Sequence, residues 1–156
     1  MPQLSLHTPI GDLTVSEEAG AIIALDWGRG RDQQPTPLLT SACDQLQDYF
    51  DGTRLHFDLP LAPQGTAFRR RVWQALREIP PGETRSYAEI AAAVGCRAPR
   101  AVGQASGANP IPILIPCHRV VAADGSLGGY SGAEGPATKR YLLALEQRAI
   151  TRGTSR

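Results

Sequence analysis

Apolar and polar residues alternate along the first part of the chain, as they do in strands that bury one face. The pattern predicts three short strands, at 4–6, 13–15 and 21–27. Gly11-Asp12 and Ala19-Gly20 supply the turns between them. From 38 to 50 the apolar side chains recur every three or four residues, which predicts a helix ending at Asp51-Gly52. A further short strand is expected at 55–59.

Residues 60–65, PLAPQG, are expected to form a linker, and we place a domain boundary there, between 1–62 and 63–156. Beyond it the spacing predicts four helices: 66–79, 86–94, 99–108 and 136–149. Ser86 and Glu89 form an S-x-x-E capping box at the start of the second. The expected fold is an α/β N-terminal domain (a small antiparallel sheet plus a helix), followed by a mostly α-helical C-terminal domain.

The helices at 86–94 and 99–108 are joined by a tight turn at Gly95, typical of a helix-turn-helix but common in proteins that bind no DNA. The helix at 99–108 consists largely of small residues, among them Ala101 and Gly103. Each glycine costs a helix about 1 kcal/mol relative to alanine, so a thin helix needs a reason. Either it packs closely on a neighbour, or it enters a confined space such as a DNA minor groove, about 6 Å wide.

Charge is distributed unevenly, although the net charge of the 156 residues is only +1. Residues 1–60 hold nine acidic and three basic residues, whereas 61–156 hold six acidic and thirteen basic ones. All the basic residues except Lys139 are arginines, whose planar guanidinium suits phosphate. The basic half therefore indicates a polyanionic partner, although two halves of opposite charge also attract each other.

Composition argues against several classes of protein. Apolar residues make up 42% and charged residues 20%, which supports a folded core, and no apolar run approaches the roughly 20 residues that span a bilayer. The three cysteines, Cys43, Cys96 and Cys117, show no zinc-ligand spacing, so we expect no metal site. Unpaired thiols and the absence of a signal-peptide pattern at the start lead us to expect a cytoplasmic protein.

The segment 109–121, NPIPILIPCHRVV, carries the clearest candidate chemistry. Ile113 to Ile115 are expected to form a buried strand-like run, and Pro116 fixes the backbone before Cys117 and His118. A cysteine is a strong nucleophile as the thiolate, which a neighbouring imidazole commonly generates. Adjacency in sequence does not establish contact, and a core cysteine beside a surface histidine gives the same pattern.

Two later features bear on this pair. The glycine-rich loop 125–132, GSLGGYSG, allows a ligand to approach the backbone closely. Tyr130 would supply an aromatic wall for the ligand, and Ser131 a hydrogen-bond donor. The same sequence also fits a hairpin turn. In the last helix, Glu146 is able to orient His118 and complete a Cys-His-Glu relay, provided that the two side chains touch.

These motifs together resemble the O6-alkylguanine-DNA alkyltransferases, also called methylated-DNA–protein-cysteine methyltransferases. PCHRV, preceded by NPIPILI and followed by GGYSG and LLALE, carries most of the resemblance. It extends to FRRRVWQALREIPPGETRSYAEIAAAVG and PRAVGQASGANP, and more weakly to YFDGTRLHFDLPL. The similarity is strong over 66–147 and loose before it.

The resemblance implies a chemical role for five residues. Cys117 accepts the alkyl group, and His118 deprotonates it through a water. Glu146 orients the imidazole, Asn109 braces the loop, and Tyr87 assists the departing guanine by hydrogen bonding. Because water does not readily cleave the resulting thioether, the protein is expected to act once per molecule, without a cofactor.

The resemblance also implies a partner: double-stranded DNA that contains O6-alkylguanine. A stacked base cannot offer in-line attack at its O6-alkyl carbon, so it must be flipped out of the duplex. Arg100 fills the vacated space, while the helix that holds Ala101 and Gly103 lies in the minor groove. The other residues implied to contact DNA or the base are Ser86, Tyr130 and Ser131. We expect a monomer that does not bind membranes.

Two other functions stay open at this point. A thiol hydrolase built on Cys117, His118 and Glu146 predicts repeated turnover of an ester or peptide. A DNA-binding sensor without chemistry predicts binding to alkylated DNA that leaves the lesion intact. Cys43 and Cys96 match no catalytic position, and we interpret both as structural.

Overall fold

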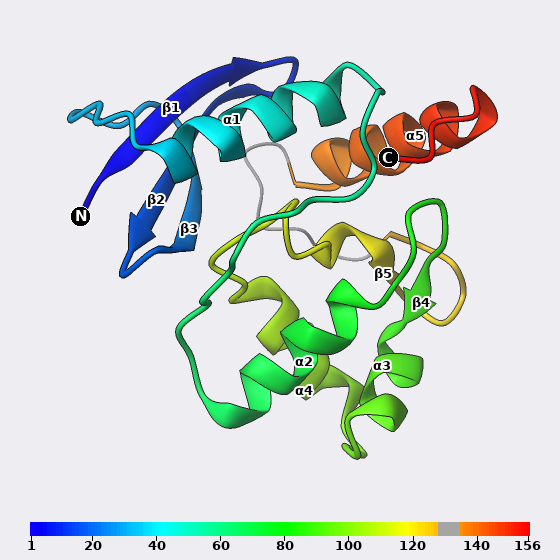
Figure 1. The fold of residues 1–156 in the computed structure, drawn as a ribbon. Helices are drawn as coiled ribbons and strands as arrows, with labels where there is room; N and C mark the ends of the chain where they lie inside the picture. The colour runs from blue at the N-terminus through cyan, green and yellow to red at the C-terminus, as the bar shows by residue number, and fades with distance from the viewer. Residues whose placement is uncertain (128–134) are drawn as a thin grey trace.

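The computed structural model describes residues 1–127 and 135–156 (Figure 1). The expected strands are present as β1 (Gln3–Thr8), β2 (Gly11–Glu18) and β3 (Ala21–Trp27). They form an antiparallel sheet in the order β1-β2-β3, against which α1 (Pro37–Phe50) packs. Thr36 starts α1 by accepting a hydrogen bond from the Leu39 N–H. The predicted α/β part is thus confirmed.

Residues 55–59 do not form the expected strand. The backbone N–H groups of Leu55 and His56 donate instead to the carbonyl of Arg156, more than ninety residues further along the chain. The segment 60–65 is not a free linker either, because Ile22 of β3 exchanges 2.8 Å hydrogen bonds with Pro60 and Ala62. This stretch therefore binds the edge of the sheet on its way to the second part of the chain.

The second part is mostly helical, as predicted. Its helices are α2 (Ala67–Arg77), α3 (Tyr87–Ala93), α4 (Pro99–Gly107) and α5 (Pro136–Thr151). Ser86 and Glu89 form the expected capping box, with two reciprocal hydrogen bonds of 3.0 Å. Gly95 adopts a φ of +73°, which the tight turn between α3 and α4 requires. Two short strands, β4 (Arg85–Ser86) and β5 (Val120–Val121), pair in parallel beside these helices.

The C-terminal residues continue α5 and then pack against the first part of the chain. Helix α5 runs to Thr151, two residues past its predicted end. Thr154 Oγ1 then donates to the Gly52 carbonyl over 2.8 Å. The tail therefore lies against the end of α1 and the segment that follows it, as the red and cyan ribbons of Figure 1 show. Among the described residues, no helix has the length and apolar character needed to cross a membrane.

The expected run Ile113–Ile115 is buried, together with Ile111, but it is not a strand. Ile113 has a φ of +74°, rare for a β-branched residue, and the Ile115 N–H donates to the Ile111 carbonyl over 2.9 Å. The chain therefore turns within this run instead of extending. Its apolar side chains join one core cluster that includes residues of both parts of the chain. The turn leads to Pro116, which is buried.

Candidate active site

Cys117 opens a single turn of 3₁₀ helix, η1 (Cys117–Arg119), directly after Pro116. Its side chain is buried, with 5% exposed. Cys117 lies close enough to Tyr87 of α3 and Lys139 of α5 to influence the pKa of both. The turn thus places three successive side chains, of Cys117, His118 and Arg119, between α2 and α5.

The contact predicted between His118 and Glu146 is present. His118 Nε2 lies 2.7 Å from Glu146 Oε2, and both residues are fully buried. Because the ionised carboxylate only accepts hydrogen bonds, Nε2 carries the proton and Nδ1 is left as an acceptor. Nδ1 is buried and has no hydrogen-bond partner among the described residues.

Burial sets the protonation state of this histidine. It lowers the pKa of His118, although the neighbouring Glu146 carboxylate opposes the shift. The imidazole is therefore neutral near pH 7, with its free lone pair on Nδ1. A neutral, oriented imidazole next to a buried thiol in the chain is the arrangement that a general base needs.

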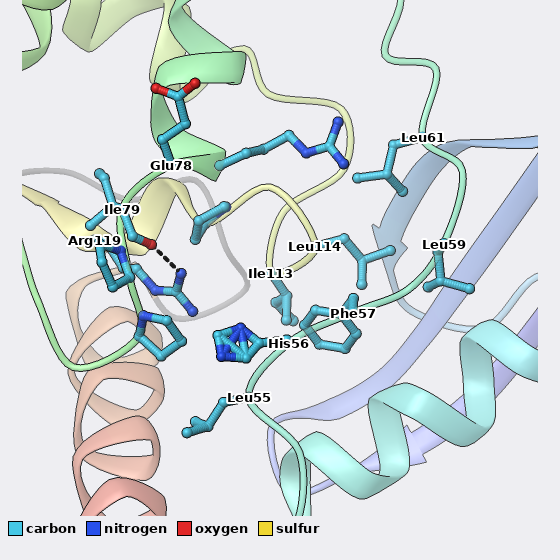
Figure 2. Close-up of a pocket in the computed structure, with 14 residues that line it drawn as sticks. Leu55, His56, Phe57, Leu59, Leu61, Glu78, Ile79, Ile113, Leu114 and Arg119 are labelled. Carbon is cyan, nitrogen blue, oxygen red and sulfur yellow. Dashed lines mark hydrogen bonds between the residues drawn. The ribbon is translucent and has the colours of Figure 1, made fainter. Parts of the chain in front are cut away.

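Arg119, to which the sequence analysis assigned no role, completes the ion pair with Glu146. Its Nε and Nη2 donate to Oε1 and Oε2 of the carboxylate, both over 2.9 Å. Its Nη1 donates to the Ile79 carbonyl over 2.7 Å, the dashed line in Figure 2. This bidentate geometry fixes the plane of the carboxylate. A charged residue within an apolar run is a signal that could have pointed to it, since buried arginines need partners.

These contacts determine the charge of Glu146. Burial by itself raises the pKa of its carboxyl, but His118 and Arg119, by charge and hydrogen bonding, lower the pKa well below its usual range. Glu146 is therefore ionised throughout the physiological pH range. Behind the ion pair, Arg119 also lines a cavity of about 350 Å³ between residues 55–61 and the end of α2 (Figure 2).

A fourth member of the cluster comes from the first part of the chain. Tyr49, near the end of α1, donates its hydroxyl to Glu146 Oε2 over 2.7 Å. Its ring lies against Phe50 and Phe57, with centroid distances of 5.3 and 5.4 Å. Helical spacing marked Tyr49 only as a core position. No local pattern links it to a partner 97 residues away.

Tyr87 and Lys139 also lie near Cys117. The Lys139 ammonium is 5.9 Å from the centroid of the Tyr87 ring and donates to the Leu127 carbonyl. Burial lowers the pKa of Lys139 to about 8, with Cys117 opposing, and burial followed by Cys117 raises the pKa of Tyr87. Tyr87 was a predicted site residue. Lys139 was not, although it is the chain's single lysine.

Asn109 connects the two ends of the turn that precedes Cys117. Its Nδ2 donates to the Ile115 carbonyl, and its Oδ1 accepts from the Ile111 N–H, both over 2.9 Å. The side chain thus holds the backbone just before Pro116, which is the geometry that a brace of this loop requires.

Helix α4 has two different faces. Val102 and Ala105 are buried, and the Ala105 carbonyl accepts a 2.8 Å hydrogen bond from Trp73 Nε1 of α2. Close packing on a neighbouring helix therefore accounts for some of the small residues. Arg100 is exposed, while Ala101 and Gly103 are half-buried.

The remaining predicted residues are placed less completely. Ser86 is half-buried and caps α3 with its hydroxyl, so its contact with DNA stays a prediction. Tyr130 and Ser131 lie outside the described residues. Cys43 is buried, and burial followed by the nearby Asp44 raises the pKa of its thiol to about 11, which makes it a poor nucleophile.

Both the sequence and the fold are similar to those of known proteins. Residues 67–148 match the family model described as 6-O-methylguanine DNA methyltransferase, DNA binding domain, and residues 4–63 match the ribonuclease-like domain of the same proteins. The constitutive methylated-DNA–protein-cysteine methyltransferase of Bacillus subtilis is 46% identical over 153 residues, covering 90% of this chain and 92% of the relative. The methylated-DNA–protein-cysteine methyltransferase of Methanosarcina barkeri is 44% identical over 151 residues, covering 91% and 94%.

A solved structure extends the similarity to three dimensions. Mycobacterium tuberculosis OGT in complex with DNA superposes with a TM-score of 0.87 at 43% identity, covering 96% of this chain and 94% of that one. Fold and sequence together therefore define an alkyl-transfer DNA-repair protein. More narrowly, the chain belongs to the 6-O-methylguanine DNA methyltransferase family, as the resemblance around PCHRV predicted.

Proposed function

We propose that this chain repairs O6-alkylguanine in double-stranded DNA by moving the alkyl group irreversibly to Cys117. Membership of the family makes it a methylated-DNA–protein-cysteine methyltransferase with DNA as its partner. The assignment of the acceptor rests on one observation above all. The buried His118–Glu146 pair leaves Nδ1 with no hydrogen-bond partner in the part of the chain that the structure describes, one residue after a buried thiol.

In the proposed reaction the Cys117 proton passes through a water to His118 Nδ1. The sulfur then attacks the O6-alkyl carbon in line, so that a C–S bond forms while the C–O bond breaks. The electron pair of the broken bond goes to guanine O6, to which Tyr87 donates a hydrogen bond. The proton that the departing guanine takes up is balanced by the proton that Cys117 gave to His118. Glu146 stabilises the imidazolium formed on His118, and Asn109 keeps the loop in place.

This chemistry predicts the kinetic form of the protein. The product is a thioether at Cys117, and water does not readily cleave a carbon–sulfur bond to an alkyl group. Each molecule therefore acts once. No step draws on a cofactor, because thiol, base and hydrogen-bond donor all come from the chain.

Access to the lesion requires a flipped nucleotide, at a cost of a few kcal/mol. We propose that α4 lies in the minor groove with Ala101 and Gly103 against the DNA, and that Arg100 fills the vacated stack. Arg100 is exposed at the start of α4, which supports this role. Ser86, Tyr130 and Ser131 are proposed to contact the DNA or the base, and the chain is proposed to act as a monomer.

Intact-mass measurement after incubation with O6-methylguanine DNA tests the proposal. One added methyl group, mapped to Cys117, is expected at a stoichiometry of one per chain. Cys117→Ser should gain none while still binding DNA, whereas Cys96→Ser, a change of a half-buried thiol, should be methylated as the wild type is. A methyl group on another residue, several turnovers per chain, or binding that leaves the lesion intact contradicts the proposal.

A further inference from the structure

The Glu146 carboxylate accepts hydrogen bonds from two separate parts of the chain. His118 and Arg119 of η1 supply three of them. The remaining one comes from Tyr49 of α1, which lies within the first sixty residues and is 1% exposed. Oε2, the oxygen that faces the imidazole, is also the oxygen that Tyr49 binds. The first part of the chain therefore contributes a polar group to the reaction centre.

We propose that Tyr49 is a positioning residue for the proton transfer from Cys117, acting through Glu146 on His118. This inference rests on the proposed function. An ionised carboxylate has no proton to give, so the phenol is the donor in the 2.7 Å hydrogen bond. The ring is fixed between Phe50 and Phe57, so the hydroxyl is held in one place. It thereby limits rotation of the carboxylate and, with it, of the imidazole.

The hydroxyl also changes how strongly Glu146 attracts the proton on His118. Donation to Oε2 withdraws negative charge from the atom that contacts Nε2. Without the hydroxyl that oxygen is more negative and stabilises the imidazolium better, so the pKa of His118 rises. Protonated His118 cannot accept the Cys117 proton. Removal of the hydroxyl therefore inactivates a larger fraction of the protein on the acidic side of neutrality.

The other charged and titratable groups around this cluster are unchanged by a substitution at position 49. They come from η1, α5 and α3, and they are Cys117, Arg119, Lys139 and Tyr87. A shift in the pH profile of such a variant is thus traceable to the lost hydroxyl. A purely structural role for Tyr49 predicts lower stability with an unchanged profile.

Single-turnover methyl transfer from O6-methylguanine DNA, measured from pH 5 to pH 9, tests the inference. Tyr49→Phe should lower the plateau rate about fivefold, as the loss of one buried hydrogen bond allows. It should also shift the midpoint of the fall in rate at low pH (the acidic limb of the pH–rate profile) about half a pH unit toward higher pH. Tyr141→Phe removes the same hydroxyl from a half-buried tyrosine of α5 and should leave both rate and limb unchanged. An unshifted limb in Tyr49→Phe overturns the inference.

A variant that keeps the packing of the ring should shift the acidic limb of the pH–rate profile in the opposite direction. A 3-fluorotyrosine at position 49 has a more acidic phenol and donates more strongly, so the limb should move to lower pH. In a Glu146→Gln background, Tyr49→Phe should have little further effect on the rate, and independent, multiplicative effects contradict action through Glu146. If the wild type itself fails to methylate Cys117, the proposed function fails. A normal wild type with an unmoved Tyr49→Phe profile rejects the present inference alone.

Discussion

A single carboxylate, that of Glu146, organises the buried polar groups of this protein. It joins the imidazole of His118, the charge of Arg119 and the hydroxyl of Tyr49 within a buried site. Buried charges are costly unless they are paired and hydrogen-bonded, and each oxygen here accepts at least one hydrogen bond. The same contacts that orient the imidazole therefore also offset the free-energy cost of burying these charged groups.

Removal of Arg119 is expected to be strongly destabilising, because it leaves the Glu146 carboxylate without its compensating charge. Arg119→Met should lower the free energy of unfolding by about 3–5 kcal/mol in urea titrations. Arg148→Met, at an exposed position of the same helix as Glu146, is the matched control and should change it by less than about 0.5 kcal/mol. Equal effects of the two substitutions would show that the buried ion pair contributes no more to the free energy of unfolding than an exposed arginine does.

The pKa shifts of His118 and Glu146 predict how stability depends on pH. Both pKa values are lower in the folded protein than in the unfolded chain, so the unfolded chain binds more protons in acid. The stability that His118 contributes is complete above its unfolded pKa, about 6.5, and is lost as the pH falls below it. That of Glu146 is lost below about pH 4.3.

Urea titrations between pH 5 and pH 8 test the histidine part of this dependence. The free energy of unfolding should decrease from pH 7 to pH 5, and His118→Gln should flatten the decrease. His56→Gln changes an exposed histidine and should preserve the wild-type slope. A wild-type curve that is flat over this range contradicts a neutral buried imidazole.

At the scale of elements, local patterns were sufficient where a segment folds on its own neighbours. The alternation in β1 to β3 and the capping box of α3 are such cases. Local patterns predicted the wrong structure at 55–59, where the backbone binds Arg156. They were also wrong at Ile113, whose positive φ turns a strand-like run back on itself. Tyr49 was hidden for the same reason, because its polar partner lies 97 residues away. The boundary between 1–62 and 63–156 stays a prediction.

Helix α4 offers a test of why it is built from small residues. A Cβ added at Gly103 would lie 3.9 Å from Cε1 of Tyr87, an ordinary contact, so the folded protein has room for it. Gly103→Ala should therefore stabilise the helix by about 1 kcal/mol. If α4 enters the minor groove, the same change should weaken binding to duplex DNA in fluorescence anisotropy titrations.

Gly107→Ala is the matched control for this test. Among the residues that the structure describes, none has an atom within 4 Å of a Cβ at position 107, which is exposed near the end of α4. The stability change in Gly107→Ala therefore measures the gain from helix propensity alone. A loss of stability in Gly103→Ala would show instead that close packing explains the glycine.

At the scale of the whole molecule, the C-terminal tail and a buried side-chain hydrogen bond both join the two parts of the chain. The tail contacts the segment after α1 through Thr154 and Arg156, and Tyr49 reaches Glu146 of α5. Deletion of 153–156 leaves the backbone N–H groups of Leu55 and His56 without their acceptor. It should lower the free energy of unfolding by about 1–3 kcal/mol.

Hydrogen exchange distinguishes this effect from a general loss of stability. In the truncated chain, the amides of Leu55 and His56 should lose protection, while those of α3 keep theirs. Thr154→Val removes only the hydroxyl contact with Gly52 and should have a smaller effect. Unchanged protection at 55 and 56 would show that the tail does not order that segment.

The position of Tyr49 on Glu146 has a consequence for faulty copies of the protein. One carboxylate both aligns the base and fastens α1 to α5, so a chain that lacks it is impaired in reactivity and in folding at once. We expect such chains to unfold more readily and to be degraded, instead of persisting as intact but inert proteins that occupy damaged sites without repairing them. In a protein that is consumed by its own reaction, this keeps the surviving pool composed of molecules still able to react.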